Sequence, residues 1–139
     1  MRQEESFGAI PLRKESGQWQ VFLIQHRKRG YWGFPKGHAE PNELPFETAC
    51  RELKEETHLD YVKLLHETPL TEQYSFPLKG ERIFKKVLYF LMEVSGTVCL
   101  QKEEINDGVW MSFPEAMNQV THPEGKAILK QVAQLLHVL

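Results

Sequence analysis

Three glutamates, Glu52, Glu55 and Glu56, lie close together in the sequence. Their i, i+3, i+4 spacing places the three side chains on one face of an α-helix. Like charges at this spacing destabilise an isolated helix by about 0.2–0.5 kcal/mol per pair, so the cluster favours a bound cation. Mg²⁺ prefers oxygen ligands and is commonly held by one or two carboxylates together with substrate phosphates. The cluster therefore indicates metal-dependent chemistry on a phosphorylated substrate, with a solvated acidic helix face as the alternative.

The residues around this cluster follow a longer pattern. Five residues separate Gly37 from Glu43, and seven more lead to the run Arg51-Glu52-Leu53-Lys54-Glu55-Glu56-Thr57-His58-Leu59. This arrangement resembles the signature of the Nudix hydrolases. One position departs from the signature, because His58 stands where the family has Gly. Gly is the usual residue in the left-handed conformation that often ends a helix, so we expect the change to affect the helix end and not the carboxylates.

The resemblance implies a fold, a cofactor and a reaction. The fold is α/β, the Nudix α/β/α sandwich with a mixed β-sheet, as a single domain over residues 1–139. The cofactor is Mg²⁺, with Mn²⁺ as an alternative, and a water molecule attacks a phosphorus atom of a nucleoside polyphosphate. The implied metal ligands are the backbone carbonyl of Gly37 and the carboxylates of Glu52, Glu55, Glu56 and Glu104.

Two of the implied site residues lie outside the glutamate cluster. Arg51 is expected to organise the site by bridging to Glu47 or Glu55 one turn away and, by analogy with the family, to Glu43. Glu104 lies six residues before Trp110, where family members carry an acid that reaches the metal; a solvated loop acid is the alternative. The predicted catalytic residues are Glu52, Glu55, Glu56, Glu104 and Arg51.

Candidate substrate-binding residues lie mostly outside the signature. Tyr74 stands fifteen residues beyond Leu59, where dinucleoside polyphosphate hydrolases of this family place a base-stacking tyrosine. The segments 35–38 and 86–89 also resemble the asymmetrical diadenosine tetraphosphate hydrolases, although Tyr89 itself is expected in the core. Aromatic faces stack on nucleobases at about 1–3 kcal/mol each, while Lys and Arg bind phosphates. The predicted substrate-binding residues are Lys36, Tyr74, Lys85, Lys86 and Arg27.

The leading functional hypothesis is metal-dependent hydrolysis of dinucleoside polyphosphates, in which diadenosine tetraphosphate is split unevenly into ATP and AMP. Removal of pyrophosphate from RNA 5′ ends is an alternative, and the basic segment Arg27-Lys28-Arg29 suits it. Nucleoside triphosphate hydrolysis is another. A non-catalytic Nudix-fold nucleotide sensor is an alternative of a different class, which the intact glutamates disfavour. We expect a small-molecule nucleotide as partner and neither DNA nor a membrane; the oligomeric state stays open.

The composition sets limits on function and location. The 139 residues carry a formal charge of −2, which argues against a general nucleic-acid binder with a large basic surface. Cys50 and Cys99 lack metal-binding spacing, which indicates reduced thiols. The start lacks the apolar core of a signal peptide, and no segment reaches the ~18 apolar residues of a membrane span. We therefore expect a cytoplasmic protein.

Hydrophobic periodicity and breakers predict the elements that carry these residues. The helix after Pro45 has apolar positions at Phe46, Ala49, Cys50 and Leu53, so we expect this stripe in the core and the carboxylate face turned outward. Strands are predicted at 7–12, 18–25, 62–71, 82–94 and 109–111, and irregular structure at 31–38 and 73–80. The runs 112–115 and 121–124 each predict a capping box that opens a helix.

Overall fold

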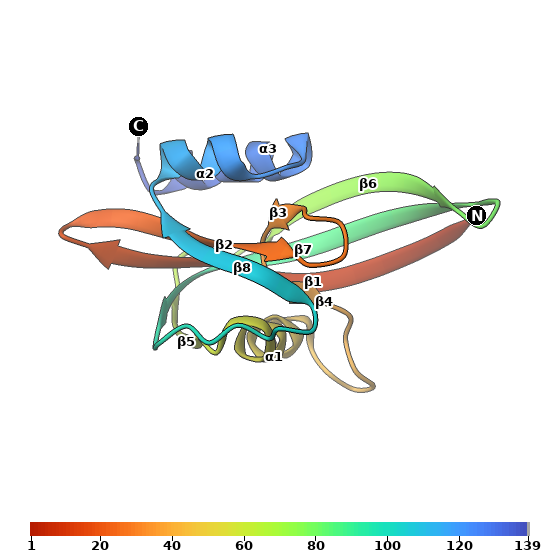
Figure 1. The fold of residues 1–139 in the computed structure, drawn as a ribbon, viewed down its shortest axis with the longest axis horizontal. Helices are drawn as coiled ribbons and strands as arrows, with labels where there is room; N and C mark the ends of the chain where they lie inside the picture. Colours follow the sequence, from red (N-terminus) through yellow and green to blue (C-terminus); the bar gives the residue numbers. More distant parts are fainter. Residues whose placement is uncertain (139) are drawn as a thin grey trace.

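The computed structural model describes residues 1–138 and shows a mixed β-sheet between two helical layers (Figure 1). Helix α1 (Pro45–Thr57) covers one face, and α2 (Phe113–Gln119) and α3 (Pro123–Leu135) lie over the other. This confirms the α/β class and the mixed sheet that the sequence predicts. Among the described residues, no helix combines the length and the apolar character that a membrane span requires.

The sheet is built around two long strands that run in parallel, β1 (Arg2–Glu15) and β7 (Glu81–Ser95). The main strand order is β3-β2-β1-β7-β5; in addition, β4 pairs with β1, β6 with β7 and β8 with β2. The other strands are β2 (Gln18–His26), β3 (Trp32–Gly33), β4 (Lys36–Gly37), β5 (Asp60–Leu64), β6 (Leu70–Leu78) and β8 (Ile105–Met111). Together with β6, the first halves of β1 and β7 extend beyond the helical layers as a three-stranded arm (Figure 1).

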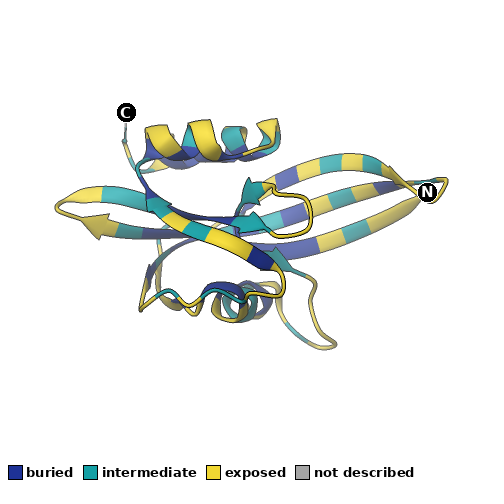
Figure 2. Ribbon diagram, in the orientation of Figure 1, coloured by how far each residue is buried: buried dark blue, intermediate teal, exposed yellow. Residues whose placement is uncertain are grey.

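The hydrophobic core lies in two clusters, one on each face of the sheet, and Figure 2 shows burial concentrated where the helices cover the strands. Leu53 of α1 joins Phe22 and Ile24 on one face. Leu129 of α3 joins Val21 and Leu23 on the other face. Because residues 21–24 bury side chains on both faces, β2 is an interior strand, as its continuous apolar run predicts.

The predicted boundaries after α1 are wrong in part. Residues 62–71 are not one strand, because β5 ends at Leu64 and β6 begins at Leu70. Residues 73–80, predicted as a loop, belong mostly to β6, which pairs along its length with β7. Pro77 is tolerated there because β6 pairs with β7 alone, and an edge strand can lack one N–H donor. Residues 31–38 also contain the short strands β3 and β4.

One of the two predicted capping boxes is confirmed. Ser112 Oγ accepts a hydrogen bond from the Glu115 N–H at 3.3 Å, and Glu115 Oε1 accepts one from the Ser112 N–H at 3.0 Å. The second prediction is wrong, because α3 has His122 as its N-cap. Thr121 Oγ1 instead accepts from the Trp32 N–H at 2.8 Å, so a contact between distant segments replaces the local cap.

Candidate active site

Helix α1 presents the glutamate cluster and ends where the signature predicts. Its first turn is held by the Leu44 N–H, which donates to Glu47 Oε1 at 2.8 Å. Its C-cap is His58, which has φ 70° and ψ 7° and donates its N–H to the Lys54 carbonyl at 2.9 Å. His58 thus adopts the left-handed conformation for which Gly is preferred. With His58 in place of Gly, the helix still ends at this position, and the steric cost of the left-handed conformation falls on His58.

The three glutamates differ sharply in exposure. Glu55 is exposed, the Glu52 side chain is 14% exposed, and Glu56 is only 4% exposed. The expectation that the carboxylate face is turned outward is therefore wrong for Glu56. The segment after β7 covers this end of α1, with the Gln101 N–H donating to the Glu56 carbonyl at 3.1 Å and the Cys99 N–H to the Thr57 carbonyl at 2.9 Å.

The buried carboxyl of Glu56 has the character of a metal ligand. Among the described residues, Glu56 Oε1 and Gln101 Oε1 are the buried side-chain atoms that lack a hydrogen-bond partner. Burial raises the pKa of Glu56 well above its usual range, and so do its hydrogen bond with Glu52 and the charges of Glu52 and Glu104. A buried oxygen without a partner, beside two further carboxylates, is a donor set that suits a hard divalent cation. The residues at this position therefore fit the Mg²⁺ that the sequence predicts.

Arg51 ties the loop before α1 to the glutamate face. Its Nε and Nη2 donate to the two carboxylate oxygens of Glu43 at 2.7 and 3.0 Å, and Nη2 also donates to the His38 carbonyl at 2.9 Å. Nη1 donates to Glu52 at 3.0 Å and to Glu55 at 3.1 Å. Of the bridges expected for Arg51, those to Glu43 and Glu55 are present, whereas Glu47 caps the helix. The Arg51 hydrogen bond is the main reason that the pKa of Glu43 falls to about 2.

Among the described residues, the side chains of the predicted ligands Glu52, Glu55, Glu56 and Glu104 are not gathered around one point. Among the residues that the structure describes, no group of three acidic, His or Cys side chains is arranged to hold an ion. Arg51 gives a physical reason, because its Nη1 lies between Glu52 and Glu55 and donates to both carboxylates. Glu52 and Glu56 lie together beside the backbone of Lys36, which hydrogen-bonds to Glu56. The arrangement thus consists of Glu52 and Glu56, which are hydrogen-bonded to each other, and Glu55, which is linked to Glu52 through Arg51.

Gly37 lies directly against this pair. It belongs to β4 and pairs with Phe7 of β1. A Cβ atom at this position would overlap the carboxyl group of Glu52, so any larger residue would displace that side chain. The close approach explains why the pattern requires Gly here. Its carbonyl stays a predicted ligand.

Lys36 and Tyr74 meet on the face of the sheet opposite to α1. Lys36 Nζ donates to the Tyr74 hydroxyl at 3.2 Å and lies 5.5 Å from the centre of the Tyr74 ring. Lys36 pairs with Gly8 of β1, whose missing Cβ leaves room for Lys36 and for the buried ring of Tyr89. Tyr89 is 2% exposed, so the expectation that it belongs to the core is confirmed.

The two neighbouring lysines of β7 are separated by the sheet. Lys85 pairs with Tyr74 and alternates with Val87 and Tyr89, so it faces the α3 side. Its side chain is only 10% exposed and lies 3.8 Å from Glu4, and burial lowers its pKa. Lys86 alternates with Phe90 and faces the α1 side. The structure therefore brings Lys36, Tyr74 and Lys85 together and leaves Lys86 on the face that α1 covers.

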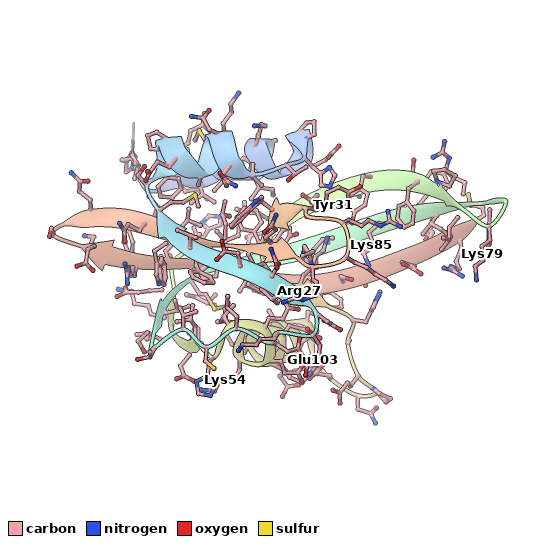
Figure 3. The ribbon with its side chains drawn as sticks, viewed as in Figure 1. Arg27, Tyr31, Lys54, Lys79, Lys85 and Glu103 are labelled. Carbon is pink, nitrogen blue, oxygen red and sulfur yellow. The ribbon has the colours of Figure 1, made fainter. Side chains whose placement is uncertain are left out.

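Arg27 lies against the segment that carries Glu104. Its N–H donates to the Glu104 carbonyl at 2.8 Å, and its Nε donates to the Lys102 carbonyl at 2.6 Å. Figure 3 shows Arg27 and Glu103 close together at the end of β8 that is next to α1. Glu104 is exposed and is near enough to Glu56 for its charge to raise the Glu56 pKa. Arg27, predicted to bind substrate, thus has structural contacts of its own.

The family follows from a match over almost the whole chain. The family model described as the NUDIX domain matches residues 2–133. The chain belongs to the Nudix family.

Two relatives of the chain share the name RNA pyrophosphohydrolase. RNA pyrophosphohydrolase of Xanthomonas campestris pv. campestris (strain B100) is 36% identical over 96 residues, which cover 63% of this chain and 46% of that protein. The protein of the same name from Stenotrophomonas maltophilia (strain R551-3) is 33% identical over 119 residues, which cover 75% of this chain and 57% of that protein. The chain thus matches about half the length of these relatives.

Solved structures share the Nudix fold at lower identity. A C. elegans Ap4A hydrolase in a binary complex has a TM-score of 0.73 at 23% identity, covering 96% of this chain and 97% of that one. The NUDIX domain of Shewanella oneidensis NrtR, complexed with ADP ribose, has a TM-score of 0.76 at 18% identity. The match covers 98% of this chain and 90% of that one. At these identities the likeness establishes the fold.

Three residues near the site were not found from the Nudix signature. His38 accepts from Arg51, and Gln101 covers the end of α1. No local sequence signal distinguishes either residue. Glu72, which is 8% exposed, lies on the same face of β6 as Tyr74, and Tyr89 donates to it at 3.5 Å. Its i, i+2 spacing to Tyr74 would have identified it if residues 73–80 had been predicted as a strand.

Proposed function

We propose that this Nudix chain is a metal-dependent pyrophosphohydrolase of dinucleoside polyphosphates, which splits diadenosine tetraphosphate into ATP and AMP. The observation that carries the proposal is the placing of two adjacent residues. Gly37 lies against the Glu52 carboxylate, while the Lys36 side chain reaches Tyr74. Strand alternation places the glutamate pair on one face of β4 and the ammonium group with the aromatic ring on the other. A substrate that passes the edge of β4 would meet both, and ammonium groups and aromatic rings bind a nucleotide's phosphate and base.

The chain's own residues have distinct roles in this proposal. Glu52, Glu55, Glu56, Glu104 and the Gly37 carbonyl are proposed to hold Mg²⁺, or alternatively Mn²⁺. When bound, the ion supplies charge stabilisation at the phosphate oxygens and lowers the pKa of water. Arg51 orients Glu52 and Glu55 through its Nη1. Glu104, as the exposed carboxylate of the group on a loop, is the proposed general base that takes the proton of the attacking water.

Water attack at the phosphorus of one terminal nucleotide gives the uneven products. The new P–O bond forms at that phosphorus, the bridge to the next phosphate breaks, and AMP and ATP separate. Attack at the middle bridge would instead give two ADP molecules. Binding one base at Tyr74 selects a terminal phosphorus because it sets the distance between that base and the glutamate pair.

A groove in the three-stranded arm supports a substrate with two nucleosides. Its volume is about 770 Å³, and residues of all three strands line it, among them Glu5, Gln73 and Lys86, whose side chains lie on the α1 face of the sheet. This volume falls within the usual range of ligand sites. Phe84 is 42% exposed and alternates with Lys86 on β7, so it offers an aromatic side chain for a second base on the face opposite to Tyr74. ATP carries a single base and could use only one of these aromatic residues.

The test compares Tyr74→Ala with Tyr61→Ala, a half-exposed tyrosine of β5 that is not in the groove. Tyr74→Ala should raise KM for diadenosine tetraphosphate by roughly 5- to 150-fold, the loss of about 1–3 kcal/mol of stacking, and change kcat less. Tyr61→Ala should leave KM unchanged. Hydrolysis in ¹⁸O-labelled water should label AMP and not ATP. ADP as the sole product would refute the uneven cleavage.

Removal of pyrophosphate from RNA 5′ ends is a second candidate. The observation that favours it is the identity of 33–36% to relatives named RNA pyrophosphohydrolase. The basic segment 27–29 offers charge for an RNA backbone. A higher kcat/KM for 5′-triphosphorylated RNA than for diadenosine tetraphosphate would favour this function. Binding of nucleotides with no turnover of either substrate would favour a sensor.

A further inference from the structure

We propose that Arg27 is a positioning residue, which clamps the segment Gln101–Glu104 against α1 and thereby holds Glu104 beside the glutamate cluster. The functional part of this inference rests on the role proposed for Glu104 above. The clamp itself rests on hydrogen bonds that are present whatever the substrate.

Arg27 holds both ends of a short turn. Its backbone N–H donates to the Glu104 carbonyl at 2.8 Å, and its side-chain Nε donates to the Lys102 carbonyl at 2.6 Å. The turn is closed within itself, because the N–H groups of Glu104 and Ile105 both donate to the Gln101 carbonyl, at 3.3 and 2.9 Å. Arg27, the residue after β2, therefore contacts two residues of the segment, and the contact with Lys102 depends on its side chain.

The opposite side of the segment is attached to the helix. The Gln101 N–H donates to the Glu56 carbonyl at 3.1 Å, inside the last turn of α1. The segment is thus held between α1, which carries the glutamates, and Arg27, which directly follows β2. Removal of the Arg27 side chain would release the Lys102 carbonyl and leave the turn held by the Arg27 N–H, by the pairing of Ile105 with His26 and by Gln101.

The side chain is needed because the regular ladder weakens at this point. Strands β2 and β8 pair antiparallel, but their register shifts between Gln25 and His26, the last residues of β2. Beyond this irregularity the Arg27 N–H still donates to the Glu104 carbonyl, and the guanidinium adds a second contact at the Lys102 carbonyl. A charged donor to a carbonyl forms a stronger hydrogen bond than a neutral one, which suits a segment that is exposed to water.

This role differs from binding an RNA phosphate, the use that the basic segment 27–29 first indicates. Arg29 offers a matched control, because it carries the same charge two residues away and has no side-chain hydrogen bond or ion pair among the described residues. A phosphate ligand and a clamp predict different responses to Arg27→Ala. The clamp acts on turnover through Glu104, whereas a phosphate ligand acts on substrate binding in a salt-dependent way.

The first experiment measures steady-state kinetics with diadenosine tetraphosphate for Arg27→Ala, Arg27→Lys and Arg29→Ala, each with Glu104 intact and with Glu104→Gln. Arg27→Ala should lower kcat by roughly 10- to 100-fold and leave KM little changed, because a displaced catalytic group costs rate. Arg27→Lys should restore part of the loss, and Arg29→Ala should cause none. In the Glu104→Gln background Arg27→Ala should add little, since the two changes affect one function.

The second experiment measures amide hydrogen exchange in the metal-free protein, without any substrate. Arg27→Ala should speed exchange at the amides of Glu104 and Ile105, while Arg29→Ala should leave them unchanged. Unchanged exchange in Arg27→Ala, a salt-dependent rise of KM with constant kcat, or equal losses in both Glu104 backgrounds would each overturn the proposal. Faster exchange in a protein that does not hydrolyse the dinucleotide would support the clamp and refute the proposed substrate.

Discussion

Arg51 and Glu43 form a two-point ion pair that joins the loop before α1 to the helix, with hydrogen bonds of 2.7 and 3.0 Å. Thr48 Oγ1 also donates to Glu43, at 2.7 Å. A bidentate pair of this kind both stabilises the contact and fixes the relative orientation of the two side chains. The pair therefore determines where the Gly37 loop lies relative to the glutamates of the helix.

The first prediction concerns acid stability. Hydrogen bonds, chiefly from Arg51, lower the pKa of Glu43 from 4.5 to about 2. A lowered folded-state pKa stabilises the fold above pH 4.5, and this stabilisation is lost as the pH falls through 4.5 toward 2. Glu43→Gln should thus lower Tm at pH 7 by about 2–4 °C, and the difference from wild type should narrow at pH 3. Calorimetry checks this. Glu40→Gln is the control, because the Glu40 carboxylate lies farther from Arg51, at 3.3 Å. A difference independent of pH would contradict it.

The second prediction separates stability from activity at Glu56. Burial and the neighbouring carboxylates raise the pKa of its carboxyl from 4.5 to about 9, so this acid costs folding free energy at pH 7 when no cation is bound. Glu56→Gln should therefore raise the free energy of unfolding in a chelator by about 1–3 kcal/mol, measured by urea denaturation. The same variant should lose at least ~100-fold in turnover with Mg²⁺. Glu55→Gln, on an exposed residue, should not increase stability. A destabilised Glu56→Gln protein would refute this account of the buried carboxyl.

The third prediction concerns the close approach at Gly37. Gly37→Ala should displace the Glu52 carboxylate, because the added Cβ would overlap it. A displaced ligand should lower turnover by about 100-fold. Gly33→Ala is the matched control, since a Cβ there meets no atom within 4 Å. Mn²⁺ affinity measured by calorimetry should fall in Gly37→Ala alone, and equal affinities in both variants would count against the site.

The fourth prediction concerns the end of α1. His58 has φ 70°, a left-handed conformation that costs a non-Gly residue about 1 kcal/mol. His58→Gly should increase the free energy of unfolding by about this amount, while His58→Ala should not. Turnover should stay unchanged, because the His58 side chain makes no hydrogen bond to the glutamates in the described part of the chain. Lower stability of the Gly variant would show that the His58 side chain contributes to folding.

Local spacing was enough to identify the parts of the molecule that depend on neighbours in sequence. The glutamates share a helix because their positions repeat with the helical period, and the Ser112 box forms because its partner is three residues away. The apolar run 21–24 predicts an interior strand because each face of it must be buried. The family signature depends on the same short-range spacing.

Tertiary structure decided what depends on distant segments. Glu56 is buried because residues 99–101 pack on the helix, and Arg27 meets Glu104 across most of the chain. Lys85 and Lys86 are adjacent in sequence, but strand alternation places them on opposite faces once the two helical layers are known. Pro77 led to the prediction of a loop, but β6 is an edge strand, which can contain a residue that lacks an N–H donor. Long-range contacts set burial and pairing, and no local pattern of residues specifies them.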